Sequence, residues 1–136
     1  MLETEQAASI RVLIADDHPL MRRGLTDILG AAPDIEVVGA AEDGAAALAL
    51  AHAVQPDIVL MDLSMPGMDG IEATEKLVEM DIPARVVVLT SYSEREKITE
   101  ALAAGAVSYL TKDAPPEAVI RAIRVAASTA RERASG

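Results

Sequence analysis

The stretch Ile58–Asp62, which reads IVLMD, decides the fold of this chain. Its four consecutive apolar residues are bounded by Pro56 and by the turn-forming residues 65–67. Such a short apolar run is typical of a strand buried on both faces of a parallel sheet. Asp62 ends this strand. In open α/β sheets the ligand crevice lies at the carboxyl ends of the strands, so we expect Asp62 to face it.

Strands and helices alternate along the rest of the chain. Short aliphatic runs predict strands at residues 10–15, 35–40, 58–62, 85–89 and 107–110. Apolar residues at helical spacing predict helices at 19–30, 44–54, 70–80, 93–105 and from 115 to about 127. Five such pairs indicate a parallel sheet with helices on both faces. We predict a flavodoxin-like (βα)5 three-layer α/β sandwich with strand order 2-1-3-4-5.

Polar residues mark the starts of three of the predicted helices. Asp43 and Asp69 are predicted N-caps of the second and third helices. Ser93 and Glu96 have the spacing of a capping box, which would begin the fourth helix.

Length and charge limit the possible functions. The 136 residues suffice for one domain, predicted at 10–127 between a flexible leader (1–9) and a tail or interdomain linker (128–136). A net charge of −10 opposes binding of this chain alone to nucleic acid. The absence of cysteine excludes disulfides, and no signal peptide or membrane-spanning run is recognisable. A cytoplasmic location is expected.

The predicted strand order brings polar residues together at one sheet edge. The first and third strands become neighbours, so Asp16, Asp17 and Asp62 converge at the switch point. Thr90 and Lys112 approach from the ends of the next two strands.

This set of side chains suits metal-assisted phosphoryl transfer. Three adjacent carboxylates repel one another unless a cation lies among them, and oxygen ligands without cysteine or histidine favour Mg²⁺. Asp62 is the predicted nucleophile. Lys112 could pair with an oxygen of the resulting acyl phosphate, while the Thr90 hydroxyl and the Ser91 backbone N–H donate to another.

Four segments resemble a known family. They read IADDHP at 14–19, MDLSMPGMDG at 61–70, LTSY at 89–92, and GA at 105–106 followed by YLTKD at 109–113. In this order they resemble the receiver domain of bacterial two-component response regulators, over residues 10–127. The NarL/FixJ type, which normally precedes a LuxR-type DNA-binding domain, is the most similar.

The resemblance implies residue roles. Asp62 would accept a phosphoryl group from a phosphohistidine of a sensor histidine kinase. Asp17, Asp62 and the backbone carbonyl of Ser64 would bind Mg²⁺ directly, with Mn²⁺ as a possible substitute, and Asp16 would assist mainly through water. Ser64, Ser91 and Lys112 would surround the phosphoryl group.

The resemblance also implies a switch and an output. Thr90 would move toward the phosphoryl group and Tyr109 would turn inward, changing the face formed by the fourth helix, fifth strand and fifth helix. That face, or the first and fifth helices, would form a homodimer. DNA would be bound only through an output domain outside this chain, so the domain is expected to be a signalling phosphoacceptor rather than an enzyme. Asp113 follows Lys112 where many receivers have proline, which leaves the isomer of that peptide bond open.

Three other functions are possible for parts of this pattern. A stand-alone receiver acting by protein contact has the same site residues. Haloacid-dehalogenase-like phosphotransferases resemble one another in having a second acid two residues after the nucleophile, where Ser64 stands here. In a flavodoxin, Asp16 and Asp17 would repel the flavin phosphate. His18 is expected to be a helix-entry residue and His52 a surface residue.

Overall fold

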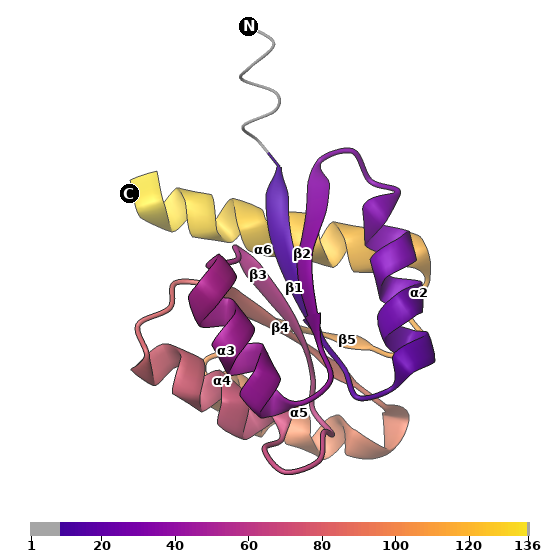
Figure 1. Ribbon diagram of the computed structural model, residues 1–136, viewed down its shortest axis with the longest axis vertical. Coiled ribbons are helices and arrows are strands. Elements are labelled where there is room, and N and C mark those ends of the chain that lie inside the picture. Colours follow the sequence, from indigo (N-terminus) through magenta and orange to yellow (C-terminus); the bar gives the residue numbers. More distant parts are fainter. Residues whose placement is uncertain (1–8, 136) are drawn as a thin grey trace, which may run out of the picture.

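The computed structural model describes residues 9–135 (Figure 1), so nearly all of the predicted leader lies outside the described part. Its five strands are all parallel and lie in the order β2-β1-β3-β4-β5, which confirms the predicted order. The strands are β1 (Ile10–Ala15), β2 (Ile35–Ala41), β3 (Ile58–Asp62), β4 (Arg85–Thr90) and β5 (Ser108–Thr111). The helices are α2 (Pro19–Gly30), α3 (Gly44–Val54), α4 (Gly70–Glu79), η1 (Tyr92–Lys97), α5 (Ile98–Ala104) and α6 (Pro116–Ser135).

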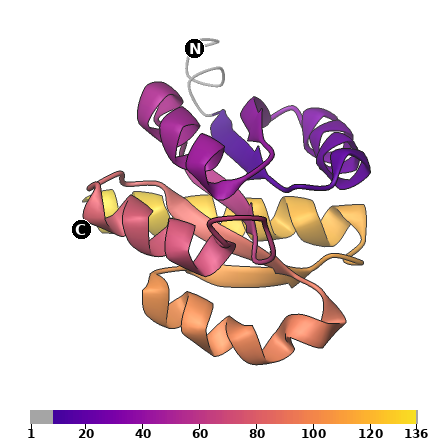
Figure 2. The same ribbon diagram turned by 60° about the horizontal axis from the view of Figure 1, so that its bottom comes forward.

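The helices cover the two faces of the sheet, as the three-layer prediction requires (Figures 1 and 2). On one face, α3, α4 and α5 pack through small or aliphatic residues such as Ala51, Leu77 and Ala101. On the other face, α2 and α6 pack through Leu29 and Ile123. Each face therefore has its own hydrophobic cluster, and burial of these apolar side chains is the main stabilising contribution to the fold.

Strand β3 lies at the centre of both clusters. All five of its residues are buried, as the continuous apolar run predicted. Its register pairs Leu60 with Ile14 of β1 and with Val87 of β4. The carboxyl ends of β1, β3 and β4 therefore lie side by side, which places the residues that follow these strands at one edge.

The start of α4 is packed tightly against the end of β3. A Cβ atom at Gly70 would overlap the carbonyl oxygen of Asp62, so only glycine fits there. The Asp69 carboxylate accepts a hydrogen bond from the Glu72 N–H (2.9 Å), which confirms the predicted cap. This packing limits the movement of the backbone at Asp62.

The predicted helix start at Ser93 is wrong. The capping box is formed two residues earlier by Ser91 and Glu94, and it begins a 3-10 helix, η1, before the α-helix proper. Both pairs have the same Ser-x-x-Glu spacing, so local sequence alone did not distinguish them. The predicted cap at Asp43 is confirmed by a hydrogen bond from the Ala46 N–H (2.8 Å).

The end of the last helix was also predicted wrongly. Helix α6 continues to Ser135 instead of giving way to a polar tail near Ala127. Alanine, arginine and glutamate in this stretch are good helix formers, and their propensity extends the helix beyond its apolar stripe. No helix within residues 9–135 has the length and apolarity needed to cross a bilayer.

Candidate phosphoacceptor and metal site

Three carboxylates meet at the carboxyl edge of the sheet. Asp16 and Asp17 follow β1, and Asp62 is the last residue of β3. Ligand atoms of these three side chains and of His18 all lie within 4.8 Å of one another. The structure therefore brings together the three acids that the sequence pattern placed at the switch point.

Burial makes this cluster electrostatically unfavourable. Asp16 and Asp62 are fully buried. Burial raises the pKa of Asp62 from 3.8 to about 6; the hydrogen bond from Lys112 opposes the rise, and the charge of Asp16 adds to it. Such a carboxylate is more basic than an exposed one, and its negative charge is stabilised when a cation approaches.

Lys112 is the cation nearest to Asp62 within the described residues. Its Nζ lies 3.0 Å from Asp62 Oδ1 and 4.0 Å from Asp16 Oδ2. Lys112 follows β5, and its side chain is only 22% exposed. One ammonium group cannot neutralise three carboxylates. All peptide bonds in the described residues are trans, including that between Lys112 and Asp113.

The free oxygens fit a divalent cation. Asp16 Oδ2 and Asp62 Oδ2 are buried without a hydrogen-bond partner. Buried carboxylate oxygens normally have partners, so two open ones facing the same cluster indicate room for a ligand that binds oxygen. Mg²⁺ and Mn²⁺ take carboxylate, carbonyl and water ligands. Asp16, Asp17 and Asp62 could therefore hold such an ion.

Hydrogen-bond donors border Asp62. The Ser64 N–H donates to Asp62 Oδ1 (3.2 Å), which orients the carboxylate. Thr90 ends β4 and is buried, and its hydroxyl donates to the Ser91 carbonyl (3.1 Å). The Ser91 N–H donates to the Glu94 carboxylate (3.3 Å). Thr90 and Ser91 are thus near the edge, but in this structure their donors are directed to local acceptors.

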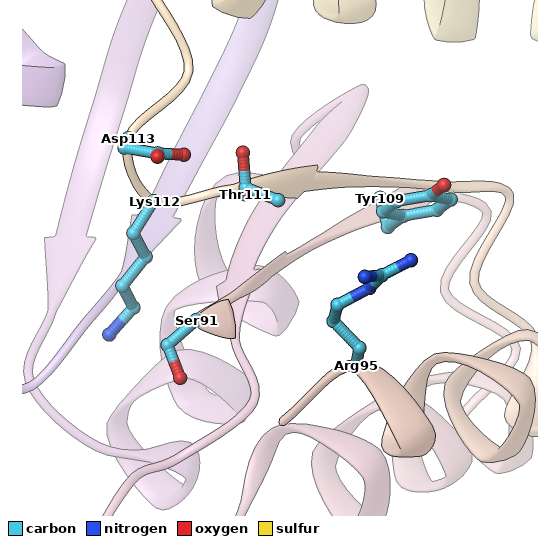
Figure 3. Close-up of a pocket in the computed structure, with 6 residues that line it drawn as sticks. All are labelled: Ser91, Arg95, Tyr109, Thr111, Lys112 and Asp113. Carbon is cyan, nitrogen blue, oxygen red and sulfur yellow. The ribbon is translucent and has the colours of Figure 1, made fainter. Parts of the chain in front are cut away.

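Tyr109 lies on β5, away from the acids. It is 48% exposed, and it lines a pocket of about 540 Å³ together with Ser91, Arg95, Thr111, Lys112 and Asp113. Figure 3 shows the Arg95 guanidinium beneath the Tyr109 ring, while the Lys112 side chain points away from both. Tyr109 therefore borders a pocket between η1 and β5, and its side chain is half exposed here.

His18 is the site residue that the sequence interpretation missed. Its Nδ1 lies 3.0 Å from Asp17 Oδ1 and 3.2 Å from Asp16 Oδ1. His18 is indeed the helix-entry residue that was expected, since it precedes Pro19 at the start of α2. The signal that could have revealed it is its position directly after two acids at a strand end.

Comparisons with known proteins agree with this geometry. The family described as the response regulator receiver domain matches residues 12–124. The chain is 42% identical over 117 residues to the nitrate/nitrite response regulator protein NarL of Escherichia coli, covering 86% of this chain and 54% of that protein. It is 46% identical over 117 residues to the transcriptional regulatory protein LiaR of Bacillus subtilis, covering 86% of this chain and 56% of LiaR.

A solved structure gives the same result. The signal receiver domain of the putative response regulator NarL from Mycobacterium tuberculosis superposes with a TM-score of 0.85 at 38% identity, covering 88% of this chain and 97% of that one. The chain spans about half the length of the curated relatives it matches. This chain therefore belongs to the response regulator receiver domain family, of the kind found in NarL and LiaR.

Proposed function

We propose that Asp62 is the phosphoacceptor of this receiver domain and takes its phosphoryl group from a phosphohistidine of a sensor histidine kinase. The observation that carries the proposal is the geometry: the buried Asp62 carboxylate lies 3.0 Å from the Lys112 ammonium group and is clustered with Asp16 and Asp17. Burial also raises the pKa of Asp62. A strand-end carboxylate that is basic and held by fixed donors is a suitable nucleophile.

The transfer is a single displacement at phosphorus. A carboxylate oxygen of Asp62 forms the new P–O bond while the P–N bond to the donor imidazole breaks, and the imidazole leaves with the electron pair and takes up a proton. Lys112 and the Ser64 N–H already contact Asp62 Oδ1, so they hold the carboxylate for the attack. In-line phosphoryl transfer depends chiefly on such positioning and on charge stabilisation.

Asp16, Asp17, Asp62 and the Ser64 carbonyl would hold Mg²⁺, or Mn²⁺ in its place. When bound, the ion offsets negative charge on the transferring oxygens. The open oxygens Asp16 Oδ2 and Asp62 Oδ2 support this assignment.

Phosphorylation would then change the surface. The Thr90 hydroxyl and the Ser91 N–H would leave their local acceptors for the phosphoryl oxygens. Tyr109, now half exposed, would turn toward the space vacated by Thr90. The face of η1, α5, β5 and α6, or that of α2 and α6, would form a homodimer, and an output domain elsewhere in the protein would bind DNA.

The domain would thus act in the cytoplasm as a signalling phosphoacceptor that assists its own phosphorylation and dephosphorylation. The function of a haloacid-dehalogenase-like phosphotransferase is not supported, because the position two residues after Asp62 is Ser64 and not the carboxylate that would act as general acid and base. Residues 128–136 would connect to the output domain, and within the described residues this connection continues helix α6 to Ser135.

Intact-mass analysis after incubation with acetyl phosphate tests the proposal. We expect the wild type to gain one phosphoryl group only with Mg²⁺, and Asp62→Asn to gain none. Asp27→Asn, at an exposed position on α2, is the matched control and should label like the wild type. Equal labelling of Asp62→Asn would remove the proposed acceptor.

A further inference from the structure

The His18 imidazole is held over the acidic cluster. Although its side chain is 63% exposed, Nδ1 lies 3.0 Å from Asp17 Oδ1 and 3.2 Å from Asp16 Oδ1. At 3.2 Å the ring is within hydrogen-bond distance of Asp16 Oδ1, and because a carboxylate oxygen accepts, Nδ1 is the donor in this contact. The backbone adds to this positioning.

Two backbone features fix where the His18 side chain begins. Pro19 restricts the preceding residue to extended conformations, and His18 has φ −95° and ψ 113°. The His18 N–H also donates to Asp16 Oδ1 (2.8 Å), which closes a turn around the carboxylate. The direction in which the His18 side chain leaves the backbone is thus fixed relative to the acids.

The distances suit a shared ion. In an octahedral complex with bonds of about 2.1 Å, neighbouring ligand atoms are about 3 Å apart and opposite ones about 4.2 Å apart. The Nδ1 to Asp17 Oδ1 distance of 3.0 Å matches neighbouring ligands. Ligand atoms of all four residues lie within 4.8 Å of one another, so the side chains farthest apart would have to draw together by about 0.6 Å to share an ion. Two buried oxygens, Asp16 Oδ2 and Asp62 Oδ2, have no hydrogen-bond partner.

We propose that His18 Nδ1 is a direct ligand of a divalent cation at this site. The ratio of transition-metal affinity to Mg²⁺ affinity is therefore higher for this domain than for a site with oxygen ligands alone. In the tautomer with its hydrogen on Nε2, the ring would give up the Nδ1 hydrogen bond to Asp16 and present the Nδ1 lone pair to the ion. Imidazole nitrogen favours ions such as Co²⁺ and Zn²⁺, whereas Mg²⁺ favours oxygen. The inference deepens the proposed function, because it concerns the metal at the same site.

Co²⁺ alone is the probe for this proposal. Coordination should give the wild type a paramagnetically shifted, exchangeable imidazole N–H resonance in proton NMR. We expect His18→Asn to lose this resonance and His52→Asn, a control at an exposed position on α3, to keep it. Absence of the resonance from the wild type, or its persistence in His18→Asn, would overturn the proposal.

Calorimetric titration separates ligation from mere positioning. We expect His18→Asn to weaken Co²⁺ binding by about tenfold and to leave Mg²⁺ binding within about twofold, because only the nitrogen-favouring ion loses a preferred ligand. An equal loss for both ions would mean that His18 only orients the acids, and would refute the ligand role. Neither readout needs phosphorylation. If Asp62 is not labelled but the Co²⁺ readouts succeed, the proposed function is refuted and His18 is still shown to be a metal ligand. If the Co²⁺ readouts fail but Asp62 is labelled, the ligand role of His18 is refuted and the acceptor role of Asp62 stands.

Discussion

Replacement of Asp62 by asparagine should stabilise the metal-free protein. Burial raises the pKa of Asp62 from 3.8 to about 6. Above pH 6 the Asp62 carboxylate is therefore ionised in the folded protein, where its charge is less favourable than in the unfolded chain. A rise of this size corresponds to about 3 kcal/mol of lost stability. Asparagine has the same shape and no charge, so we expect Asp62→Asn to regain about 1–3 kcal/mol at pH 8.

The sign of the pH dependence follows from the direction of the pKa change. Between pH 4 and 6 the folded state binds the Asp62 proton more readily than the unfolded state does. The Asp62 contribution therefore makes the wild type more stable as pH falls through this window, and its destabilising effect is fully present only above pH 6. The stability difference between wild type and Asp62→Asn should accordingly shrink as pH is lowered from 8 to 4.5.

Urea unfolding followed by circular dichroism measures this difference. Asp27→Asn is the control, because this exposed residue should change the free energy of unfolding by no more than about 0.5 kcal/mol. Saturating Mg²⁺ should narrow the gap at pH 8, since the ion binds the folded wild type more tightly than the variant. A variant that is no more stable than the wild type at pH 8, or a gap that does not change with pH, would refute the electrostatic reasoning.

Three further substitutions test neighbouring parts of the site. Asp17→Ala should weaken Mg²⁺ binding severalfold in calorimetry, because it deletes a direct ligand, and an unchanged titration would contradict that role. Gly70→Ala should lower the free energy of unfolding in urea by about 1–3 kcal/mol, because the added Cβ would overlap the carbonyl oxygen of Asp62 at the end of β3. Gly24→Ala is the control and should not destabilise the protein, because the space around its Cβ is open. An equal loss for both variants would disprove the packing argument. Glu94→Ala removes the acceptor that now holds the Ser91 N–H, so this N–H becomes free to donate to the phosphoryl group. A hydrogen bond worth about 1 kcal/mol should slow the loss of the phosphoryl group about fivefold, as followed by intact mass. An unchanged rate of loss would show that Glu94 does not compete for the Ser91 N–H.

The sheet could be predicted because its strands carry a strong local signal. The IVLMD run at 58–62 is buried throughout, and its aspartate lies at the crevice. Once right-handed crossovers fix the strand order, residues that follow strands must share an edge. The convergence of Asp16, Asp62 and Lys112 therefore needed no information about side-chain packing.

Features that depend on side-chain orientation were harder to predict. The choice between Ser91 and Ser93 as a cap depends on where β4 ends, which pairing with its neighbours decides. The end of α6 depends on helix propensity without an apolar stripe to mark it. The approach of His18 to the acids depends on the rotamer that its backbone allows, and sequence spacing does not encode that rotamer.

The identity of the phosphorylated residue is the most direct test of the account. Borohydride reduction converts an aspartyl phosphate to homoserine, and tandem mass spectrometry of peptides then locates the change. After treatment with acetyl phosphate and Mg²⁺, we predict homoserine at position 62 and at no other aspartate. Homoserine at Asp16 or Asp17, or at none of the three acids, would contradict the assignment of Asp62 as the acceptor.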